Sequence, residues 1–174
     1  MMVRAVLSRF RSVSRVLIPA LAGFAVSGCV LVADGGNFDI EYGEADKLVT
    51  YTVDDLPDWA PFSSVVRAGD TLYVSGHLGR LPGGTTLIDG GAGPETTQTI
   101  ANIERSLALA GATLNDLTTC TVYLTDMADY QAMNAAYAEA LGGHRPARVT
   151  AGVSELALGA RVEIECIAYA PEVD

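Results

Sequence analysis

The residues of this sequence best suited to chemistry are one arginine, Arg148, which follows Pro146-Ala147, and two glutamates of a strand-like segment, Glu163 and Glu165. A planar guanidinium can hold a carboxylate through two parallel, charge-assisted hydrogen bonds. In a strand, Glu163 and Glu165 share one face, which is then unusually polar. The alternative for Arg148 is a surface ion pair. We interpret Glu165 as a solvated side chain and Glu163 as functional.

This chain has few residues suited to binding a metal ion or a phosphate group. The only histidines are His77 and His144, and Cys120 and Cys166 lack the spacing of metal ligands. No glycine-rich phosphate-binding pattern is present. We therefore expect neither a metal nor an organic cofactor.

Cys120 and Cys166 each lie within a strand-like run of residues. An oxidising compartment would permit a disulfide between them. Cysteines in the middle of strands are, however, more often small buried hydrophobic side chains. The prediction is two free thiols.

The charge balance excludes some classes of partner. The chain has 11 Lys and Arg residues against 21 Asp and Glu, a formal net charge of −10 at pH 7. Four of the arginines precede residue 16, so without residues 1–28 the formal net charge is −14. Nucleic-acid surfaces need clustered Lys and Arg, whereas the remaining cations are scattered. We expect no general binding of RNA or DNA.

Residues 1–28 have the organisation of a bacterial signal peptide. The four arginines precede an apolar run over residues 16–26, which Pro19 interrupts and which is shorter than the roughly 20 residues of a membrane-spanning helix. The sequence Val26-Ser27-Gly28-Cys29 resembles a lipobox, in which the cysteine thiol is linked to a diacylglycerol. An ordinary secretory peptide with an incidental cysteine is the alternative.

Lipidation at Cys29 would anchor the protein to a membrane without a spanning helix, because each buried CH₂ of the acyl chains contributes about 0.8 kcal/mol. The protein would then lie on the non-cytosolic side, in the periplasm or at the cell surface. Residues 29–57 are rich in Gly, Asp and Glu, with little periodicity, and are interpreted as a tether. One globular domain is expected over residues 58–174.

The order of strand and helix patterns predicts an α/β (α+β) domain with a mixed sheet and both helices on one face. The opposite face of the sheet must also be buried, and self-association of the chain is the simplest way to bury it. A glycine-rich loop is expected over residues 79–93. The expected elements are an edge strand at 49–53, a hairpin of 64–67 with 71–75, a helix from Pro94 to Ala110, a strand at 118–124, a second helix capped by Asp126 or Asp129, and strands at 147–153 and 161–169.

Several short motifs on these elements resemble the RidA (YjgF) imine/enamine deaminase family. Each motif is weak alone, but their order and spacing over about 115 residues are specific. They are Pro61-Phe62-Ser63 before residues 65–69, the run 72–76, Gln98 with Asn102, the run 121–127 with Asn134 and Tyr137, and Pro146-Ala147-Arg148 before residues 162–168.

The resemblance implies a chorismate-mutase-like fold, a homotrimer and active sites in clefts between subunits. Members of this family hydrolyse 2-imino acids, formed from enamines such as 2-aminoacrylate, to 2-keto acids and ammonia without a cofactor. Arg148 then matches the residue that holds the substrate carboxylate. Glu163 matches the glutamate that positions the attacking water and handles its proton.

The resemblance also implies a set of substrate-binding residues. Thr150 lies two residues beyond Arg148 on the same strand face, although a core threonine is an open alternative. Asn134 could instead serve a structural cap or turn. The implied substrate-binding residues are Arg148, Ser75, Gly76, Phe62, Asn134 and Thr150.

Three positions depart from the family pattern. Phe62 stands where many members carry tyrosine, His77 where glutamine is common, and Val149 where serine or threonine is frequent. Loss of one neutral hydrogen bond costs on the order of 1 kcal/mol, which weakens catalysis several-fold without abolishing it. We therefore expect the protein to be active, although these residues do not identify its substrate.

Three functions compete at this point. The first is hydrolytic deamination of small 2-imino or enamine acids. The second is a non-enzymatic lipoprotein that binds small carboxylates in the same cleft, because the cytosolic enzymes that generate 2-aminoacrylate would not share its compartment. Ribonuclease activity, linked to some family members, is disfavoured by the acidic charge.

Overall fold

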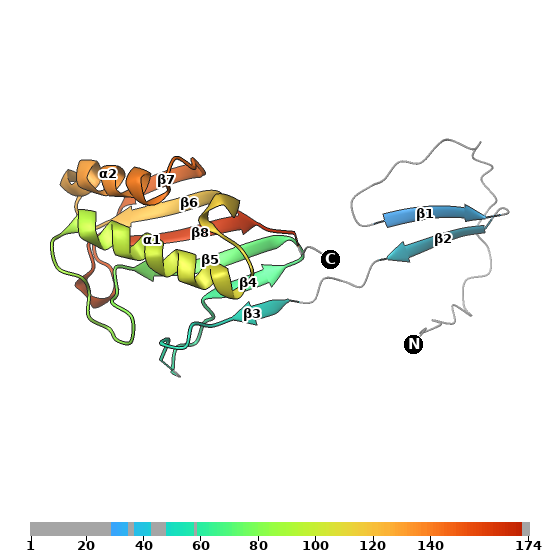
Figure 1. Ribbon diagram of the computed structural model, residues 1–174, viewed down its shortest axis with the longest axis horizontal. Coiled ribbons are helices and arrows are strands. Elements are labelled where there is room, and N and C mark those ends of the chain that lie inside the picture. The colour runs from blue at the N-terminus through green and yellow to red at the C-terminus, as the bar shows by residue number, and fades with distance from the viewer. Residues whose placement is uncertain (1–28, 35–36, 43–47, 58, 172–174) are drawn as a thin grey trace. The chain divides into compact units, whose positions relative to one another are not determined.

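The computed structural model describes residues 29–34, 37–42, 48–57 and 59–171 (Figure 1). The chain divides into two compact units, Met1–Ala45 and Asp46–Asp174. The signal peptide predicted for residues 1–28 lies outside the described residues. Cys29, the predicted site of lipidation, is the first residue described.

The first unit contains a two-stranded antiparallel sheet of β1 (Cys29–Asp34) and β2 (Asn37–Tyr42). Cys29 pairs with Tyr42, and Asp34 pairs with Asn37. These strands lie within residues 29–57, whose interpretation as a tether stays a prediction. Residues 29–33, which form most of β1, are largely apolar, and this suits a strand.

The second unit is built on a six-stranded sheet with the strand order β3-β4-β5-β8-β6-β7. Neighbouring strands are antiparallel except β6 and β7, which are parallel. The predicted strands, including the edge strand and the hairpin, are confirmed to within a few residues. The strands are β3 (Val49–Tyr51), β4 (Val65–Ala68), β5 (Thr71–Leu78), β6 (Leu117–Leu124), β7 (Ala147–Gly152) and β8 (Val162–Tyr169).

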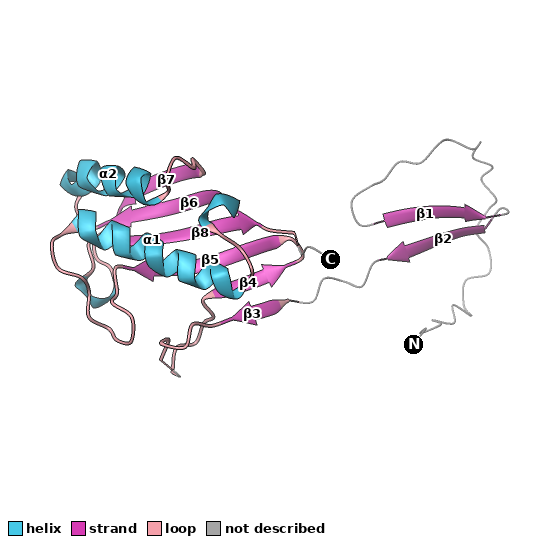
Figure 2. Cartoon of the chain, viewed as in Figure 1, coloured by secondary structure: helices cyan, strands magenta, loops and turns pink. Residues whose placement is uncertain are grey.

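Both α-helices of this unit, α1 (Ala92–Leu109) and α2 (Tyr130–Ala140), lie on the same face of the sheet (Figure 2). The predicted mixed sheet with two helices on one face is thus confirmed. Asp129 is the N-cap residue of α2, but its side chain makes no capping hydrogen bond; the Asp126 side chain instead caps a preceding 3-10 turn. The 3-10 helices are η1 (Leu114–Asp116), η2 (Met127–Asp129) and η3 (Ala157–Gly159).

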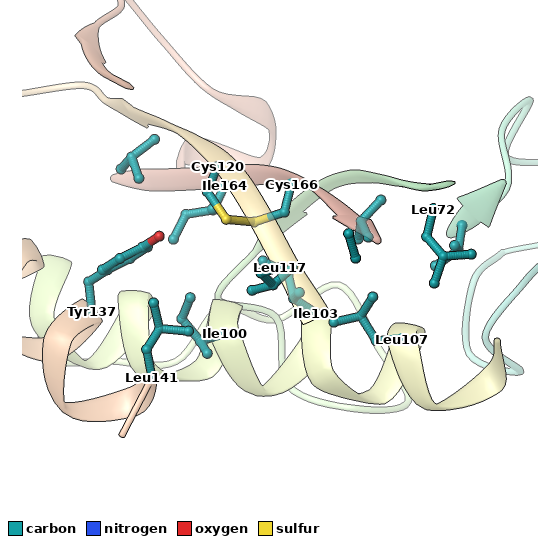
Figure 3. Packing of buried hydrophobic residues seen from close by; sticks show 14 of the residues in the cluster. Leu72, Ile100, Ile103, Leu107, Leu117, Cys120, Tyr137, Leu141, Ile164 and Cys166 are labelled. Atoms are coloured by element: carbon teal, nitrogen blue, oxygen red, sulfur yellow. A yellow bond between two sulfur atoms is a disulfide. The ribbon is translucent and has the colours of Figure 1, made fainter. Parts of the chain in front are cut away.

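The hydrophobic core lies between the helices and the sheet (Figure 3). Full burial of an aliphatic side chain stabilises the folded state by about 1.5–3 kcal/mol. The apolar side chains of this layer therefore hold both helices against the sheet. Ten of its residues have no measurable exposure: Val65, Leu72, Ile103, Leu107, Val122, Leu124, Met133, Val162, Ile164 and Ala168.

A disulfide between Cys120 and Cys166 joins the two central strands (Figure 3). The prediction of two free thiols is therefore wrong. The two residues are 46 positions apart in sequence, but the antiparallel register places Cys120 of β6 directly opposite Cys166 of β8, with the Cα atoms 4.1 Å apart. Both side chains also point into the core, where each is buried.

No helix within the described ranges has both the length and the apolar character needed to cross a membrane.

We expect the disulfide to stabilise the second unit by about 2–4 kcal/mol, because it restrains a long loop of the unfolded chain. Urea unfolding of the oxidised protein should be compared with that of the Cys120→Ala/Cys166→Ala variant and of the reduced wild type. The double-alanine variant and the reduced wild type should both have a lower free energy of unfolding than the oxidised protein. Reaction of the untreated protein, unfolded in urea, with a thiol reagent at either cysteine would contradict the disulfide.

Candidate functional site

Arg148 lies on the helix-covered face of the sheet, where its guanidinium packs against α2. Its Nη2 donates hydrogen bonds to Asn134 Oδ1 at 2.7 Å and to Tyr130 Oη at 3.3 Å. Its Cζ lies 4.8 Å from the centre of the Tyr137 ring, a distance at which a cation is attracted by the ring. These contacts orient the guanidinium without neutralising its charge.

The remaining N–H groups of Arg148, at Nε and Nη1, have no hydrogen-bond partner among the described residues, nor does the side chain form an ion pair there. The guanidinium opens into a pocket of about 390 Å³. The ion-pair alternative for Arg148 is therefore not realised within the described part of the chain. The free donors are suited to a planar anion such as a carboxylate.

Two hydroxyl oxygens in the same region also lack partners. Thr150 Oγ1 and Tyr137 Oη are buried and make no hydrogen bond within the described residues. Burial raises the pKa of the Tyr137 hydroxyl, more than the nearby charge of Arg148 lowers it. Thr150 follows Arg148 on the same face of β7. We call Arg148, Asn134, Tyr137 and Thr150 the arginine half-site.

Glu163 lies on the opposite face of the sheet. It alternates in β8 with Val162 and Ile164, which are fully buried under the helices, so its side chain points away from them. The carboxylate is half-buried and has no hydrogen-bond or ion-pair partner among the described residues. Burial raises its pKa, and the neighbouring charge of Glu165 raises it further.

A bulge in β5 places Ser75 and Gly76 beside Glu163. The register between β5 and β8 shifts between Val74 and His77. A Cβ atom at Gly76 would overlap Glu163 Oε1, so the missing side chain makes room for the carboxylate. Ser75 Oγ is occupied by a hydrogen bond to the Ser63 carbonyl oxygen at 2.7 Å.

Glu165 accepts a hydrogen bond from Tyr123 Oη at 2.9 Å and is exposed. This bond is the main reason that the pKa of Tyr123 is raised, with smaller contributions from burial and from the charges of Glu165 and Glu163. The interpretation of Glu165 as a solvated residue fits this geometry. We call Glu163, Gly76, Ser75 and Phe62 the glutamate half-site.

Next to Gly76 lies a mostly apolar cavity of about 310 Å³, which we call the Phe62 cavity. It is bordered by the segment 53–64, the bulge of β5 and the η3 turn. Sequence reasoning assigned Phe62, Ser75 and Gly76 to the site but missed most of this lining. Its residues are Val53, Leu56, Pro57, Trp59, Ala60, Phe62, Ser64, Ser75, Gly76, His77, Leu78, Arg80, Thr85, Asn102, Arg105, Ala157 and Leu158.

His77 at the edge of the cavity is held as a neutral ring. Its Nδ1 donates to the Ser75 carbonyl oxygen at 2.6 Å, and its Nε2 accepts from Ser106 Oγ at 2.7 Å. Burial lowers the pKa of the ring, which is consistent with this neutral form. Both ring nitrogens are therefore engaged, and His77 has a structural role.

An ion pair between Asp55 and Arg105 closes another side of the cavity, with 2.6 Å between Asp55 Oδ1 and Arg105 Nη2. Burial alone would raise the pKa of Asp55, but hydrogen bonds from the Gly83 N–H and from Arg105 outweigh it and lower the pKa. This pair fixes the loop that carries Asp55. The cavity wall is thus partly rigid.

The two half-sites cannot meet within one chain, because the sheet separates them. Arg148 pairs in register with Cys120, whose side chain points into the core, whereas Glu163 points out of the other face. That other face carries half-exposed apolar side chains: Tyr73, Val149 and Tyr169 are 50%, 61% and 55% exposed. Within the described residues, the guanidinium of Arg148 has no anionic partner and the carboxylate of Glu163 has no partner, and the two groups lie on opposite faces of the sheet.

Tyr137 of the arginine half-site and Tyr130, which also contacts Arg148, were not assigned a site role from the sequence. Tyr130, Asn134 and Tyr137 follow the i, i+4, i+7 spacing of one helix face, which could have linked them to Arg148. Within the described residues, no cluster of three or more His, Cys, Asp or Glu side chains is arranged to hold a metal ion.

Comparison with known proteins assigns the family. A family model described as endoribonuclease L-PSP matches residues 53–170. A RutC family protein of Pyrococcus horikoshii is 38% identical over 123 residues, which are 71% of this chain and 98% of the relative. The 2-iminobutanoate/2-iminopropanoate deaminase of Mus musculus is 38% identical over 108 residues, which are 62% of this chain and 80% of the relative.

Solved structures agree. RidA from an Antarctic Psychrobacter bacterium matches with a TM-score of 0.65 and 34% identity, covering 70% of this chain and 98% of that one. Yeast Mmf1 matches with a TM-score of 0.66 and 29% identity, covering 71% and 99%. The chain therefore belongs to the endoribonuclease L-PSP (RidA) family, in which several relatives are named as imine deaminases.

The close approach of Gly76 to Glu163 predicts a coupling between the two positions. Gly76→Ala should destabilise the wild-type protein, because the new methyl group displaces the carboxylate. In a Glu163→Ala background the same change should be neutral or stabilising, since alanine restricts the unfolded chain. The coupling free energy from urea unfolding should be about 0.5–3 kcal/mol. Additive effects would contradict the geometry.

Proposed function

We propose that this protein hydrolyses 2-imino acids to 2-keto acids and ammonia at a site that two copies of the chain build together. One copy contributes the arginine half-site and the next copy contributes the glutamate half-site. The observation that carries the proposal is the separation of two unpaired, opposite charges, Arg148 and Glu163, on opposite faces of one sheet.

Arg148 binds the substrate carboxylate. Its Nη2 is already held by Asn134, and the tyrosines of α2 fix the plane of the guanidinium. The free N–H groups can then form charge-assisted hydrogen bonds to a carboxylate at little further cost in side-chain freedom. The Thr150 hydroxyl, buried and without a partner in the described protein, supplies a further hydrogen bond to the substrate or to the attacking water.

Glu163 activates water for the chemical step. A water molecule adds its oxygen to the carbon of the C=N bond while Glu163 takes one of its protons and the imine nitrogen gains a proton. In the resulting carbinolamine, the hydroxyl proton is transferred to the amine nitrogen by way of Glu163. The C–N bond then breaks, ammonia leaves, and the hydroxyl oxygen becomes the carbonyl of the 2-keto acid. Burial and the charge of Glu165 raise the pKa of Glu163, which makes its carboxylate a better proton acceptor than an ordinary surface glutamate.

The remaining residues of the glutamate half-site shape the space beside this carboxylate. Gly76 leaves room for it, and the bond from Ser75 to Ser63 fixes the bulge that carries Gly76. Phe62 offers an apolar surface without a hydroxyl. The carboxylate of Glu163 is the one acid of this half-site, which supports its role in the chemical step.

The proposed assembly is a homotrimer. The face of the sheet opposite the helices carries half-exposed Tyr73, Val149 and Tyr169, whose burial would stabilise a contact between copies. A contact that joins two different patches of the chain is head-to-tail and closes into a ring when the rotation fits. Such a ring repeats the same composite site at each contact.

Complementation between two inactive variants tests the composite site. Arg148→Ala and Glu163→Gln should each lower kcat/KM by about 10²-fold or more, because each removes a group that contacts the substrate or the water. Co-expressed in equal amounts, they should recover about a quarter of the wild-type activity, since that share of head-to-tail contacts unites both intact residues. Ammonia release from an enzymatically generated 2-imino acid is the readout.

Arg161→Ala is the matched control, because Arg161 forms an exposed surface ion pair with Asp129 and should leave activity nearly unchanged. Activity that never recovers in the mixture, although mixed oligomers form, would contradict a site shared between copies. Binding of a 2-keto acid without ammonia release by the wild type would favour the non-enzymatic binder. RNA cleavage is not proposed, since a formal net charge of −10 disfavours binding of a polyanion.

We further propose that the protein is a lipoprotein on the non-cytosolic side of a membrane. The signal-like residues 1–28 and the lipobox ending at Cys29 support this location. The disulfide between Cys120 and Cys166 supports it independently, because such bonds persist in oxidising compartments.

The anchor is tested by labelling with a fatty-acid analogue in a bacterial host. The wild-type chain should take up the label and remain with the membrane fraction, whereas Cys29→Ala should lose both properties, because the acyl chains supply the membrane affinity. Cys120→Ala/Cys166→Ala, which leaves Cys29 in place, should keep the label. Equal labelling of the Cys29→Ala variant would refute the proposal.

A further inference from the structure

The Phe62 cavity adjoins the proposed reacting centre. Gly76 lines the cavity, and the carboxylate of Glu163 lies directly over the missing side chain of Gly76. A substrate whose C=N carbon stands at Glu163 therefore has this cavity within reach of its side chain. The contact at Gly76 joins the cavity to the glutamate half-site.

The size and lining of the cavity do not match a substrate with a methyl side chain. Its volume of about 310 Å³ lies at the lower end of the range of about 300–1,000 Å³ that is typical of pockets for drug-sized ligands. Its wall includes Leu56, Trp59, Phe62 and Leu158. Such a space favours a larger apolar group, because apolar surface gains most when it leaves water.

Leu158 is held in an unusual backbone conformation at this wall. Its φ is 59° and its ψ is 10°, and no other non-glycine residue in the described ranges has a positive φ. The left-handed region is unfavourable for leucine because of its Cβ atom, whereas glycine, which has no Cβ atom, adopts it readily. The next residue, Gly159, also has a positive φ, so a glycine at 158 would fit the turn without strain.

A strained leucine persists where its side chain serves a purpose that glycine cannot serve. The Leu158 side chain is 53% exposed and therefore adds little to the core. It does border the Phe62 cavity. The strain is thus explained by what the side chain contacts in the cavity.

We propose that the Phe62 cavity receives the side chain of the substrate, that this side chain is a branched aliphatic or aromatic group, and that Leu158 is a specificity-determining residue for it. The inference rests on the proposed function, since it assigns the substrate class of the same site. It narrows the substrates from small 2-imino acids in general to those with a large apolar side chain.

The test compares 2-imino acids with methyl, isobutyl and benzyl side chains, each generated in place by an amino acid oxidase. The decrease in the semicarbazone formed with added semicarbazide reports imine hydrolysis. We expect kcat/KM for the isobutyl or benzyl substrate to exceed that for the methyl substrate by about tenfold or more, the range that a few methylenes contribute in an apolar pocket.

Leu158→Gly should lower kcat/KM for the larger substrate by roughly tenfold, change that for the methyl substrate less than about twofold, and leave the thermal midpoint unchanged or higher. Leu158→Asn, which tolerates the left-handed conformation but is polar, should show the same loss. Leu109→Gly is the control, because Leu109 is a half-exposed leucine at the end of α1 that does not line the cavity.

The outcomes separate the two proposals. Turnover with equal preference for all three substrates, or a preference that survives in Leu158→Gly, overturns the inference and leaves the proposed function intact. A change of oligomeric state in Leu158→Gly without a change of preference also overturns it, since the cavity would then belong to a contact between copies. No turnover of any imine removes the proposed function itself.

Discussion

The alternation of side chains across a single sheet is the constraint on which this structure depends. Only one face of the sheet carries helices, so each strand sends every second residue into the core and the others outward. Arg148 and Glu163 fall on opposite sides of that division. One chain therefore holds both charges needed for the proposed chemistry and keeps them apart.

The same constraint leaves each charge without a partner in the described protein. A protein selected for stability alone would pair or remove a half-buried carboxylate whose pKa is raised by burial and by a like charge. It would also place glycine, not leucine, at a left-handed position. Such departures from local preference concentrate where a protein binds or reacts. Here Glu163 lies against Gly76, and Leu158 borders the cavity that Gly76 also lines.

Much of the fold followed from local patterns. The strands of β4 to β8 and both helices were predictable because apolar residues recur with strand or helix periodicity and glycines mark the turns. The pairing of β1 with β2 was not predicted, since the short apolar run of residues 29–33 directly follows the signal-like segment and is a weak strand signal. The pairing of Cys120 with Cys166 was missed for a stronger reason: strand register over 46 residues is set by packing, which no short segment encodes.

The sequence by itself determined which residues are candidates for the proposed chemistry, because a guanidinium, a carboxylate and a missing side chain are properties of residue type. It also determined the order of the elements and the acidic charge. Only the tertiary structure decided that Arg148 packs on the tyrosines of α2, that Gly76 lies under Glu163, and that the cavity reaches Leu158. These facts depend on strand register and on the covered face of the sheet, which arise when distant segments pack together.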